Sequence, residues 1–403
     1  MKWQQADGAA SGDPFPFLGP ERPMADPPGW TGQASAPRKT LLALGEAAYR
    51  HGSGTAGQGI SVKPQASTGP GRASSPVGRS LMHASPCPVL KRDPLPLEAS
   101  VLRTLAYFGV FGHPLKPEEL LCYGDQAPTD AEGLAEALGS LKAQGLVEEQ
   151  AGHWGLRGTR AAVARRMLSE ARARARMPKA LSMSRLIGRF PFVRGVFISG
   201  SMSKGCLAED GDIDYFIITR AGRLWVARTL LVLYKRLVLF NSHRDFCVNY
   251  FIDEEHLAVE DRNRYTATEV VTLLPTYGNG VAAEFFRHNA WAYAMLPGMQ
   301  APASRLADRR GDRLKQRLER LLGGRSGRWL EQWCMRITHA RQRRRFGHMD
   351  AAAFDLAFRT RPYVSKHHPR NFQHSVMEAY VKSVAELEQR HGTPLQEAWH
   401  ASW

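Results

Sequence analysis

The chain has 403 residues, which is too long for one ordinary core and long enough for two or three domains. Lysine and arginine exceed aspartate and glutamate by 54 to 38, giving a formal net charge of +16. This charge favours nucleic acids, nucleotides or anionic lipid headgroups as partners, although an arginine-rich proteome explains it equally well. The five cysteines are scattered without a CxxC pair, which argues against a disulfide framework or a structural zinc site.

The first 96 residues are dominated by Gly, Pro, Ala and Ser and cannot bury enough apolar surface to offset the entropy of ordering. We therefore predict a disordered tail over residues 1–96. Met82 stands just before the sequence becomes globular, so an incorrectly assigned start remains an alternative for residues 1–81. No signal peptide is recognisable, and charges interrupt the longest apolar run, Leu224 to Phe240. A cytoplasmic protein without membrane insertion is expected.

Residues 97–158 have the pattern of three helices followed by a small hairpin. Apolar residues recur at helical spacing, Pro117 opens a second short helix, and Thr129 with Glu132 reads as a capping box for a third. Two short strand-like runs then flank Ala151-Gly152. The order resembles a winged-helix domain. Because the exposed face of the third helix is acidic, protein docking or a structural role is favoured over reading DNA.

Residues 159–190 are predicted to form a helical linker. The segment from Arg160 to Arg176 is rich in arginine and alanine. A solvated helix face explains this composition, and RNA binding is the alternative.

The chemistry is concentrated in residues 191–260, where Val193–Ser199 is a predicted strand. It runs into Gly200-Ser-Met-Ser-Lys-Gly205, and Asp-Ile-Asp at residues 212–214 then opens a second strand. Gly200 allows the backbone to approach a phosphate closely, and a following short helix supplies amide donors toward an anion.

Asp212 and Asp214 are two residues apart at the start of a strand, so their side chains point to the same side. Their α-carbons would then lie roughly 6.6 Å apart. Paired carboxylates can share divalent metal ions in phosphoryl transfer, and Mg²⁺ suits a site made only of oxygen ligands. The sequence therefore predicts a metal site at Asp212 and Asp214 that is completed by nucleotide phosphates.

This arrangement resembles the signature of the DNA polymerase beta nucleotidyltransferase superfamily over roughly Phe192 to Asp253. The matching residues are Gly200, Ser201, Gly205, Asp212 and Asp214. The resemblance implies that the aspartates bind Mg²⁺ or Mn²⁺ and that the turn, including Ser203 and Lys204, holds an NTP such as ATP. A nucleoside monophosphate would be transferred to an acceptor with loss of pyrophosphate.

The superfamily normally carries a third carboxylate on a later strand, where it helps to deprotonate the acceptor hydroxyl. Alternation along the strand from Asp245 to Ile252 places Asp245, Cys247, Asn249 and Phe251 on one face. Either Asp245 or Asn249 could occupy the third position. Asn249 is better centred in the strand, but an amide cannot act as a general base.

Residues 261–403 are predicted to be a helical region. Three apolar stripes at helical spacing are expected to be core. They comprise Leu314, Leu318 and Leu321; Trp329, Trp333 and Ile337; and Val376, Tyr380, Val384 and Leu387. Arg262, Thr266, Thr268 and Glu269 are expected near the cleft, without an assigned role.

The predicted fold is thus α+β, with a tail, a winged-helix-like domain, a mixed-sheet nucleotidyltransferase core and a helical C-terminal region. The leading hypothesis is a magnesium-dependent nucleotidyltransferase whose acceptor is unknown. The alternative is a catalytically weak or inactive nucleotide-binding regulatory or scaffold protein. A nucleic-acid partner, with the basic chain acting mainly as an RNA-binding module, is the third possibility.

Overall fold

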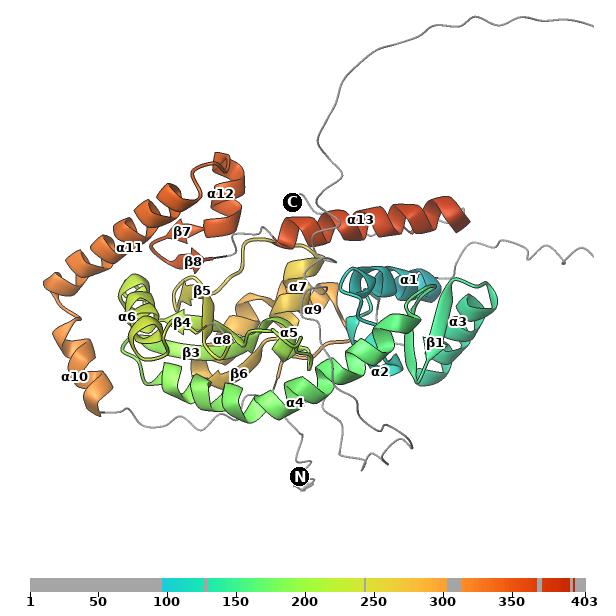
Figure 1. The fold of residues 1–403 in the computed structure, drawn as a ribbon, viewed down its shortest axis with the longest axis horizontal. Coiled ribbons are helices and arrows are strands. Elements are labelled where there is room, and N and C mark those ends of the chain that lie inside the picture. The colour runs from blue at the N-terminus through green and yellow to red at the C-terminus, as the bar shows by residue number, and fades with distance from the viewer. Residues whose placement is uncertain are drawn as a thin grey trace, which may run out of the picture. The chain divides into compact units, whose positions relative to one another are not determined.

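The computed structural model shows a mixed α+β structure of helices around one main sheet (Figure 1). It describes residues 96–126, 130–242, 244–302, 313–367, 372–391 and 394–395. These residues belong to one of the two compact units into which the chain divides. The tail predicted for residues 1–96 and the alternative start at Met82 lie outside the described residues, except for residue 96.

The N-terminal part contains three helices and a hairpin, in the predicted order. These are α1 (Pro96–Gly109), α2 (Pro117–Tyr123), α3 (Ala131–Ala143), β1 (Val147–Gln150) and β2 (His153–Leu156). Ala151 and Gly152 have φ angles of 50° and 73°, which suit the two-residue turn between twisted strands. The N-cap of α3 is Asp130, whose side chain accepts a hydrogen bond from the Gly133 amide. Thr129, the predicted cap, lies outside the described residues.

A long helix, α4 (Arg160–Gly188), connects this part to the sheet (Figure 1). It contains the predicted arginine-rich segment, but its arginines have different environments. The Arg166 side chain is 2% exposed and contacts Glu119 of α2 at 2.5 Å, whereas Arg165 and Arg174 are exposed. The segment is therefore partly a buried contact rather than wholly a solvated face.

The main sheet has the strand order β6-β3-β4-β5-β8-β7. Its strands are β3 (Val193–Ser199), β4 (Asp214–Thr219), β5 (Cys247–Asp253), β6 (Leu274–Tyr277), β7 (Thr360–Arg361) and β8 (Val364–Lys366). Among the strand pairs of the described residues, only β4 and β5 are parallel, and α6 (Leu224–Leu237) connects these two strands. The predicted strand, turn, strand and helix of residues 193–239 are confirmed as elements.

Residues 261–403, predicted to be a helical region, contain helices but also the three short strands β6, β7 and β8, which the sequence did not indicate. These strands are two to four residues long, which is too short for an alternating pattern to stand out. Pro275 lies in β6, an edge strand that pairs only with β3, and a proline is tolerated there because one side needs no amide donor.

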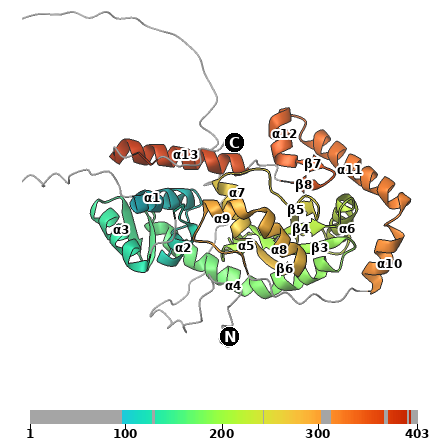
Figure 2. The same ribbon diagram turned by 180° about the vertical axis from the view of Figure 1, so that it is seen from behind.

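Helices cover both faces of the sheet (Figures 1 and 2). The core on one face joins α4 and α6 to residues such as Val196 and Ile217. The core on the other face joins Phe197, Phe216 and Ile252 to three helices. These are α7 (Arg264–Val271), α8 (Asn279–His288) and α9 (Ala290–Met295). Residues Tyr215–Thr219 of β4 are therefore all buried, and their side chains point alternately into the two cores, as expected for a strand covered on both faces.

The remaining helices are α5 (Gly200–Ser203), α10 (Arg313–Leu321), α11 (Arg325–Arg345), α12 (Ala351–Phe358) and α13 (Phe372–His391). The apolar stripe predicted on α13 is confirmed as core, since Val376, Tyr380 and Leu387 are buried against α1 and its neighbours. Of the helices in the described ranges, none is both long enough and apolar enough to cross a bilayer.

The apolar stripes predicted as core on α10 and α11 are largely exposed, so this prediction is wrong. Trp329 and Trp333 are 65% and 48% exposed, and Leu321 is 72% exposed. The buried face of α11 instead carries Glu331, whose carboxylate accepts hydrogen bonds from the Trp225 and Val226 amides at 2.7 and 2.9 Å. Glu331 thus caps the first amides of α6, and this contact determines which face of α11 packs against α6.

Candidate functional site

The turn after β3 lies directly against β4. Gly200 has a φ of +67°, and a Cβ atom added to it would lie 2.6 Å from Asp214 Oδ2. The two strands are antiparallel, with Ser199 paired to Asp214, so the strand register brings the turn to the carboxylate. Glycine is required at position 200 both for its backbone angle and for this close approach.

The rest of the turn is held by its own hydrogen bonds. The Ser203 hydroxyl donates to the Gly200 carbonyl oxygen at 2.9 Å, and Ser203 is buried. Gly205 has a φ of +69°, which ends the turn in a conformation that favours glycine. Ser203 and Gly205 therefore shape the turn, whereas Gly200, Ser201 and Lys204 line a cavity.

Asp214 is a half-buried carboxyl with an altered pKa. Burial raises its pKa to about 6; the nearby charges of Asp212 and Glu269 also raise it, while a Cys247 hydrogen bond and Lys204 lower it. The negative charges of Asp212 and Glu269 thus add to burial in favouring the protonated form of Asp214. Asp212 is half-buried and lies outside the cavity lining, in the loop that leads into β4.

The structure separates the two candidates for the third position. Asn249 lines the cavity, and its Nδ2 donates a hydrogen bond to Asp214 Oδ1 at 2.9 Å. Asp245 instead forms an ion pair with Arg176 of α4 and is not part of the lining. Of the two, the amide rather than the carboxylate therefore stands beside Asp214.

The predicted alternation along β5 is wrong, because the strand carries a bulge. Tyr215 pairs with Val248 but Phe216 pairs with Tyr250, which leaves Asn249 as an extra residue. Phe251 consequently packs in the core on the opposite face of the sheet. A bulge shifts every later side chain by one position, and periodicity cannot reveal it.

The Lys204 side chain forms hydrogen bonds with the glycine turn and with helix α7. Its Nζ donates to the Gly200 carbonyl at 3.0 Å and to Glu269 Oε1 at 2.8 Å. Glu269 belongs to α7, and Thr266 and Thr268 of the same helix also line the cavity. These three residues lie where the sequence placed them, near the cleft, whereas Arg262 packs over Trp291.

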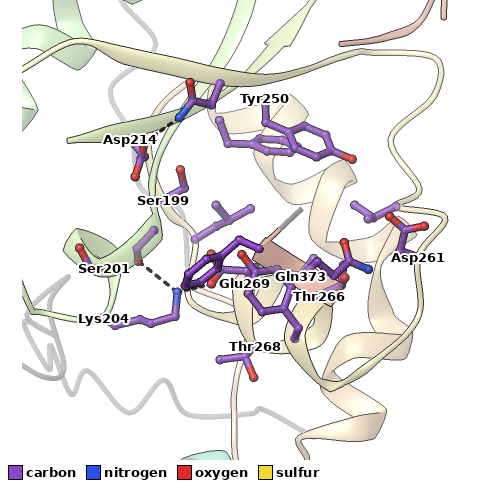
Figure 3. Close-up of a pocket in the computed structure, with 18 of the residues that line it drawn as sticks. Ser199, Ser201, Lys204, Asp214, Tyr250, Asp261, Thr266, Thr268, Glu269 and Gln373 are labelled. Carbon is purple, nitrogen blue, oxygen red and sulfur yellow. Dashed lines mark hydrogen bonds and ion pairs between the residues drawn. The ribbon is translucent and has the colours of Figure 1, made fainter. Parts of the chain in front are cut away.

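The cavity has a volume of about 420 Å³. Figure 3 shows Asp214, Ser199, Ser201 and Lys204 toward one end, Asp261 at the other, and Tyr250 and Gln373 on opposite sides between them. Its walls come from helices α1, α5, α7, α12 and α13 and from strands β3, β4, β5 and β8. The volume is in the range of small-molecule sites.

Much of this lining was not predicted. Tyr107, Phe108 and Phe111 from α1 and the turn after it, and Phe372 and Gln373 from α13, face the same cavity as the glycine turn. The available signal was Tyr-Phe-Gly-Val-Phe-Gly-His at residues 107–113, an aromatic cluster interrupted by glycines. Only tertiary packing shows that this cluster is more than core.

His113 and Cys206 lie side by side in the lining, with His113 Nδ1 3.8 Å from the Cys206 Sγ. Burial, followed by the charge of Arg166, lowers the pKa of His113 well below its usual range. Burial raises the pKa of the Cys206 thiol to about 11. Both groups are therefore neutral at pH 7, and Cys206 does not have the thiolate character of a nucleophile.

The candidate metal ligands near the glycine turn are carboxylate oxygens of Asp212 and Asp214. Within the described ranges, no group of three or more His, Cys, Asp and Glu side chains could hold a metal ion. Asp212, in the loop that leads into β4, and Asp214, at the start of β4, offer two carboxylate groups, fewer than the three that such a group requires. Magnesium is typically held by one or two carboxylates and substrate phosphates.

Comparisons with models of protein families, with curated proteins and with solved structures gave no significant match to the chain.

Proposed function

We propose that the protein is a magnesium-dependent nucleotidyltransferase of the DNA polymerase beta type, which transfers a nucleoside monophosphate from an NTP to an acceptor. The observation that carries this proposal is the contact between the Gly200 turn and Asp214, where no side chain fits between backbone and carboxylate. It supports a site in which a phosphate on the turn and a metal ion on the carboxylates meet.

The proposal assigns a role to each polar residue in and around the glycine turn. The Gly200 turn and the Ser201 hydroxyl bind the triphosphate, and Lys204 moves from Glu269 to a phosphate oxygen. Asp212 and Asp214 hold Mg²⁺, which neutralises phosphate charge when bound. Asn249 keeps Asp214 oriented through its hydrogen bond. Catalysis would come mainly from positioning and electrostatics, as is usual for phosphoryl transfer.

The reaction balances without a further reactant. An acceptor hydroxyl oxygen forms a bond to the α-phosphorus, and the bond from this phosphorus to the bridging oxygen of the β-phosphate breaks. Pyrophosphate leaves with the electron pair, and the hydroxyl proton passes to a carboxylate of the cavity or to water.

The N-terminal helices and hairpin are proposed to be a winged-helix-like domain with a structural role. The exposed face of α3 carries Glu132 and Glu136, and the exposed Lys142 is paired with Glu149 at 3.3 Å. This face is poor for phosphate contacts along DNA. The same part of the chain supplies Tyr107, Phe108 and Phe111 to the cavity.

The test uses ATP labelled either at the α-phosphate or at the γ-phosphate, incubated with the protein, Mg²⁺ and a cell extract as the source of acceptor. Nucleotidyl transfer carries the α-label into a product and releases the γ-label in pyrophosphate. Asp212→Asn should abolish this transfer, while its circular dichroism spectrum stays that of the wild type. Transfer at the wild-type rate by Asp212→Asn would refute the proposed role of the carboxylates.

A second function has one specific observation in its favour. Asn249 stands beside Asp214 in a position where an amide cannot accept a proton from an acceptor. A regulatory protein that binds nucleotides without turning them over fits this observation. Binding of Mg²⁺ and nucleotide by wild-type protein, with neither label transferred under any condition, would favour this alternative.

A further inference from the structure

The cavity has two ends of different chemistry. The phosphate end of the proposed function contains Ser201, Lys204 and Asp214. Away from it the lining is mostly aromatic, with rings from five separate elements, including Phe216 of β4. Tyr107 and Phe108 come from α1, Tyr250 from β5, Tyr265 from α7 and Phe372 from α13, while Phe111 follows α1. Figure 3 shows Tyr250 across the space from Gln373 and Thr266.

The aromatic rings form two walls. On the sheet, Phe216 and Tyr250 are stacked, with centroids 5.0 Å apart and an interplanar angle of 24°. On the helical side, the ring centroid of Phe372 lies 6.2 Å from that of Phe111 and 6.3 Å from that of Tyr265. Phe111 and Phe372 remain 41% and 48% exposed, although both line the cavity. Because these two rings are partly exposed inside the cavity, a flat apolar ligand can bury more of their surface.

The charge of the lining opposes that of the whole chain. The chain carries +16. Among the described residues of the lining there are three carboxylates, Asp214, Asp261 and Glu269, and two lysines, Lys204 and Lys366. Each lysine is already paired: Lys204 with Glu269 at 2.8 Å, and Lys366 with Asp261 at 3.6 Å.

A polynucleotide acceptor requires the opposite arrangement, since binding to its backbone depends on a row of unpaired lysines and arginines. The exposed arginines of α11, such as Arg343 and Arg344, are absent from the described lining. The cavity therefore favours an acceptor that brings no phosphate of its own.

We infer that the acceptor is a small molecule with a flat, apolar ring body and no negative charge, whose ring lies between the aromatic walls and whose hydroxyl points to the phosphate end. This inference rests on the proposed function. It excludes a nucleic-acid end as the acceptor and gives the N-terminal helices a direct part in substrate binding through Phe111.

The test compares two probes that share one ring system, 2-naphthol and 2-naphthalenesulfonate. Each is titrated by fluorescence into the full-length protein with Mg²⁺ and a saturating non-hydrolysable ATP analogue. 2-Naphthol should bind about tenfold or more tightly than the sulfonate, because the sulfonate adds a negative charge to an acidic site.

Variants then locate the probe. Phe372→Ala and Phe111→Ala should each weaken 2-naphthol binding about fivefold or more, in line with the loss of one stacking ring. Phe240→Ala is the matched control, because Phe240 is 90% exposed and lies outside the lining. It should leave the dissociation constant unchanged.

Absence of 2-naphthol binding, equal or tighter binding of the sulfonate, or an unchanged affinity in Phe372→Ala would overturn the inference. Competition of 2-naphthol by a single-stranded RNA oligonucleotide, with steep salt dependence, would overturn it in favour of a nucleic-acid acceptor. Binding of the ATP analogue is measured in the same samples. If 2-naphthol binds as expected and the analogue does not, the proposed function fails while the ligand class of the cavity stands.

Discussion

At the scale of single residues, we expect Gly200 to tolerate no other side chain. Two features disfavour a Cβ atom at this position: the φ of +67°, and the distance of only 2.6 Å between an added Cβ atom and Asp214 Oδ2. Gly200→Ala should lower the free energy of unfolding by about 1–3 kcal/mol, measured by urea denaturation. It should also abolish nucleotide binding, because the turn moves away from the carboxylate.

Gly139→Ala is the matched control for this change. Gly139 lies in α3, is exposed, and has nothing within 4 Å of an added Cβ atom. Alanine should stabilise this helix by about 0.5–1 kcal/mol. If Gly200→Ala were as stable as Gly139→Ala, the strain at the turn would be absent.

Asp214 makes the stability of the protein depend on pH. The folded protein holds this proton more tightly than the unfolded chain does, because burial raises the pKa from 3.8 to about 6. The charged carboxyl therefore destabilises the folded state above a pH of about 6, and this cost disappears as the pH falls toward 3.8.

Asp214→Asn should consequently raise the free energy of unfolding by about 1–3 kcal/mol near pH 8, and by almost nothing near pH 4. Denaturant curves in metal-free buffer at the two pH values measure the difference. Asp210→Asn, which removes an exposed carboxyl of the same loop, should have no effect at either pH. A loss of stability in Asp214→Asn near pH 8 would contradict this prediction. It would mean that the charged carboxylate stabilises the folded protein through its hydrogen bonds and nearby cations.

The residues that sequence alone identified are those whose role is local. Gly200 and Asp214 could be predicted because a turn and the strand after it are set by residues close in the chain. Asn249 could be named as a candidate but not placed, since the bulge in β5 depends on pairing with β4. Asp245, the other candidate, forms an ion pair with Arg176, which is 69 residues away in the chain and therefore beyond any local pattern.

At the scale of elements, Arg166 connects α4 to the N-terminal helices. Its side chain contacts Glu119 at 2.5 Å, Glu170 at 2.8 Å and the Pro114 carbonyl at 2.9 Å. Arg166→Leu leaves the buried Glu119 without its main partner and should lower the free energy of unfolding by about 3–5 kcal/mol.

Arg174→Leu, on an exposed face of the same helix, should change the free energy of unfolding by no more than about 0.5 kcal/mol. Thermal and urea unfolding of both variants provide the comparison. A cost below about 1 kcal/mol for Arg166→Leu would show that Glu119 regains water, and that α4 is not held to α2 by this pair.

Elements with a strong local period were predictable, and short or exposed ones were not. The strand β3 and the hairpin of β1 and β2 follow from apolar runs and turn residues. The strands β6 and β8 are too short to carry a period, and their role depends on the neighbours they pair with. On α11, the apolar stripe indicated a helix correctly, but the cap formed by Glu331 decides which face is buried.

At the scale of the whole molecule, the cavity is assembled from segments that are far apart in the chain, from Tyr107 to Gln373. No local pattern can predict such an arrangement. The same applies to the apolar stripe of α11, where Trp329 and Trp333 are stacked with centroids 6.0 Å apart and remain exposed. The glycine turn could be found in the sequence, whereas the cavity it faces could not.

Asp212 and Asp214, with the Gly200 turn, are proposed to form a magnesium-dependent nucleotide site. Calorimetric titration of a non-hydrolysable ATP analogue, and then of the other three nucleotides, with and without Mg²⁺ tests it most directly. Wild-type protein should bind at least one nucleotide only with Mg²⁺, and Asp212→Asn/Asp214→Asn should lose this binding while remaining folded. No binding of any nucleotide to wild-type protein, or equal binding to the double variant, would contradict the account.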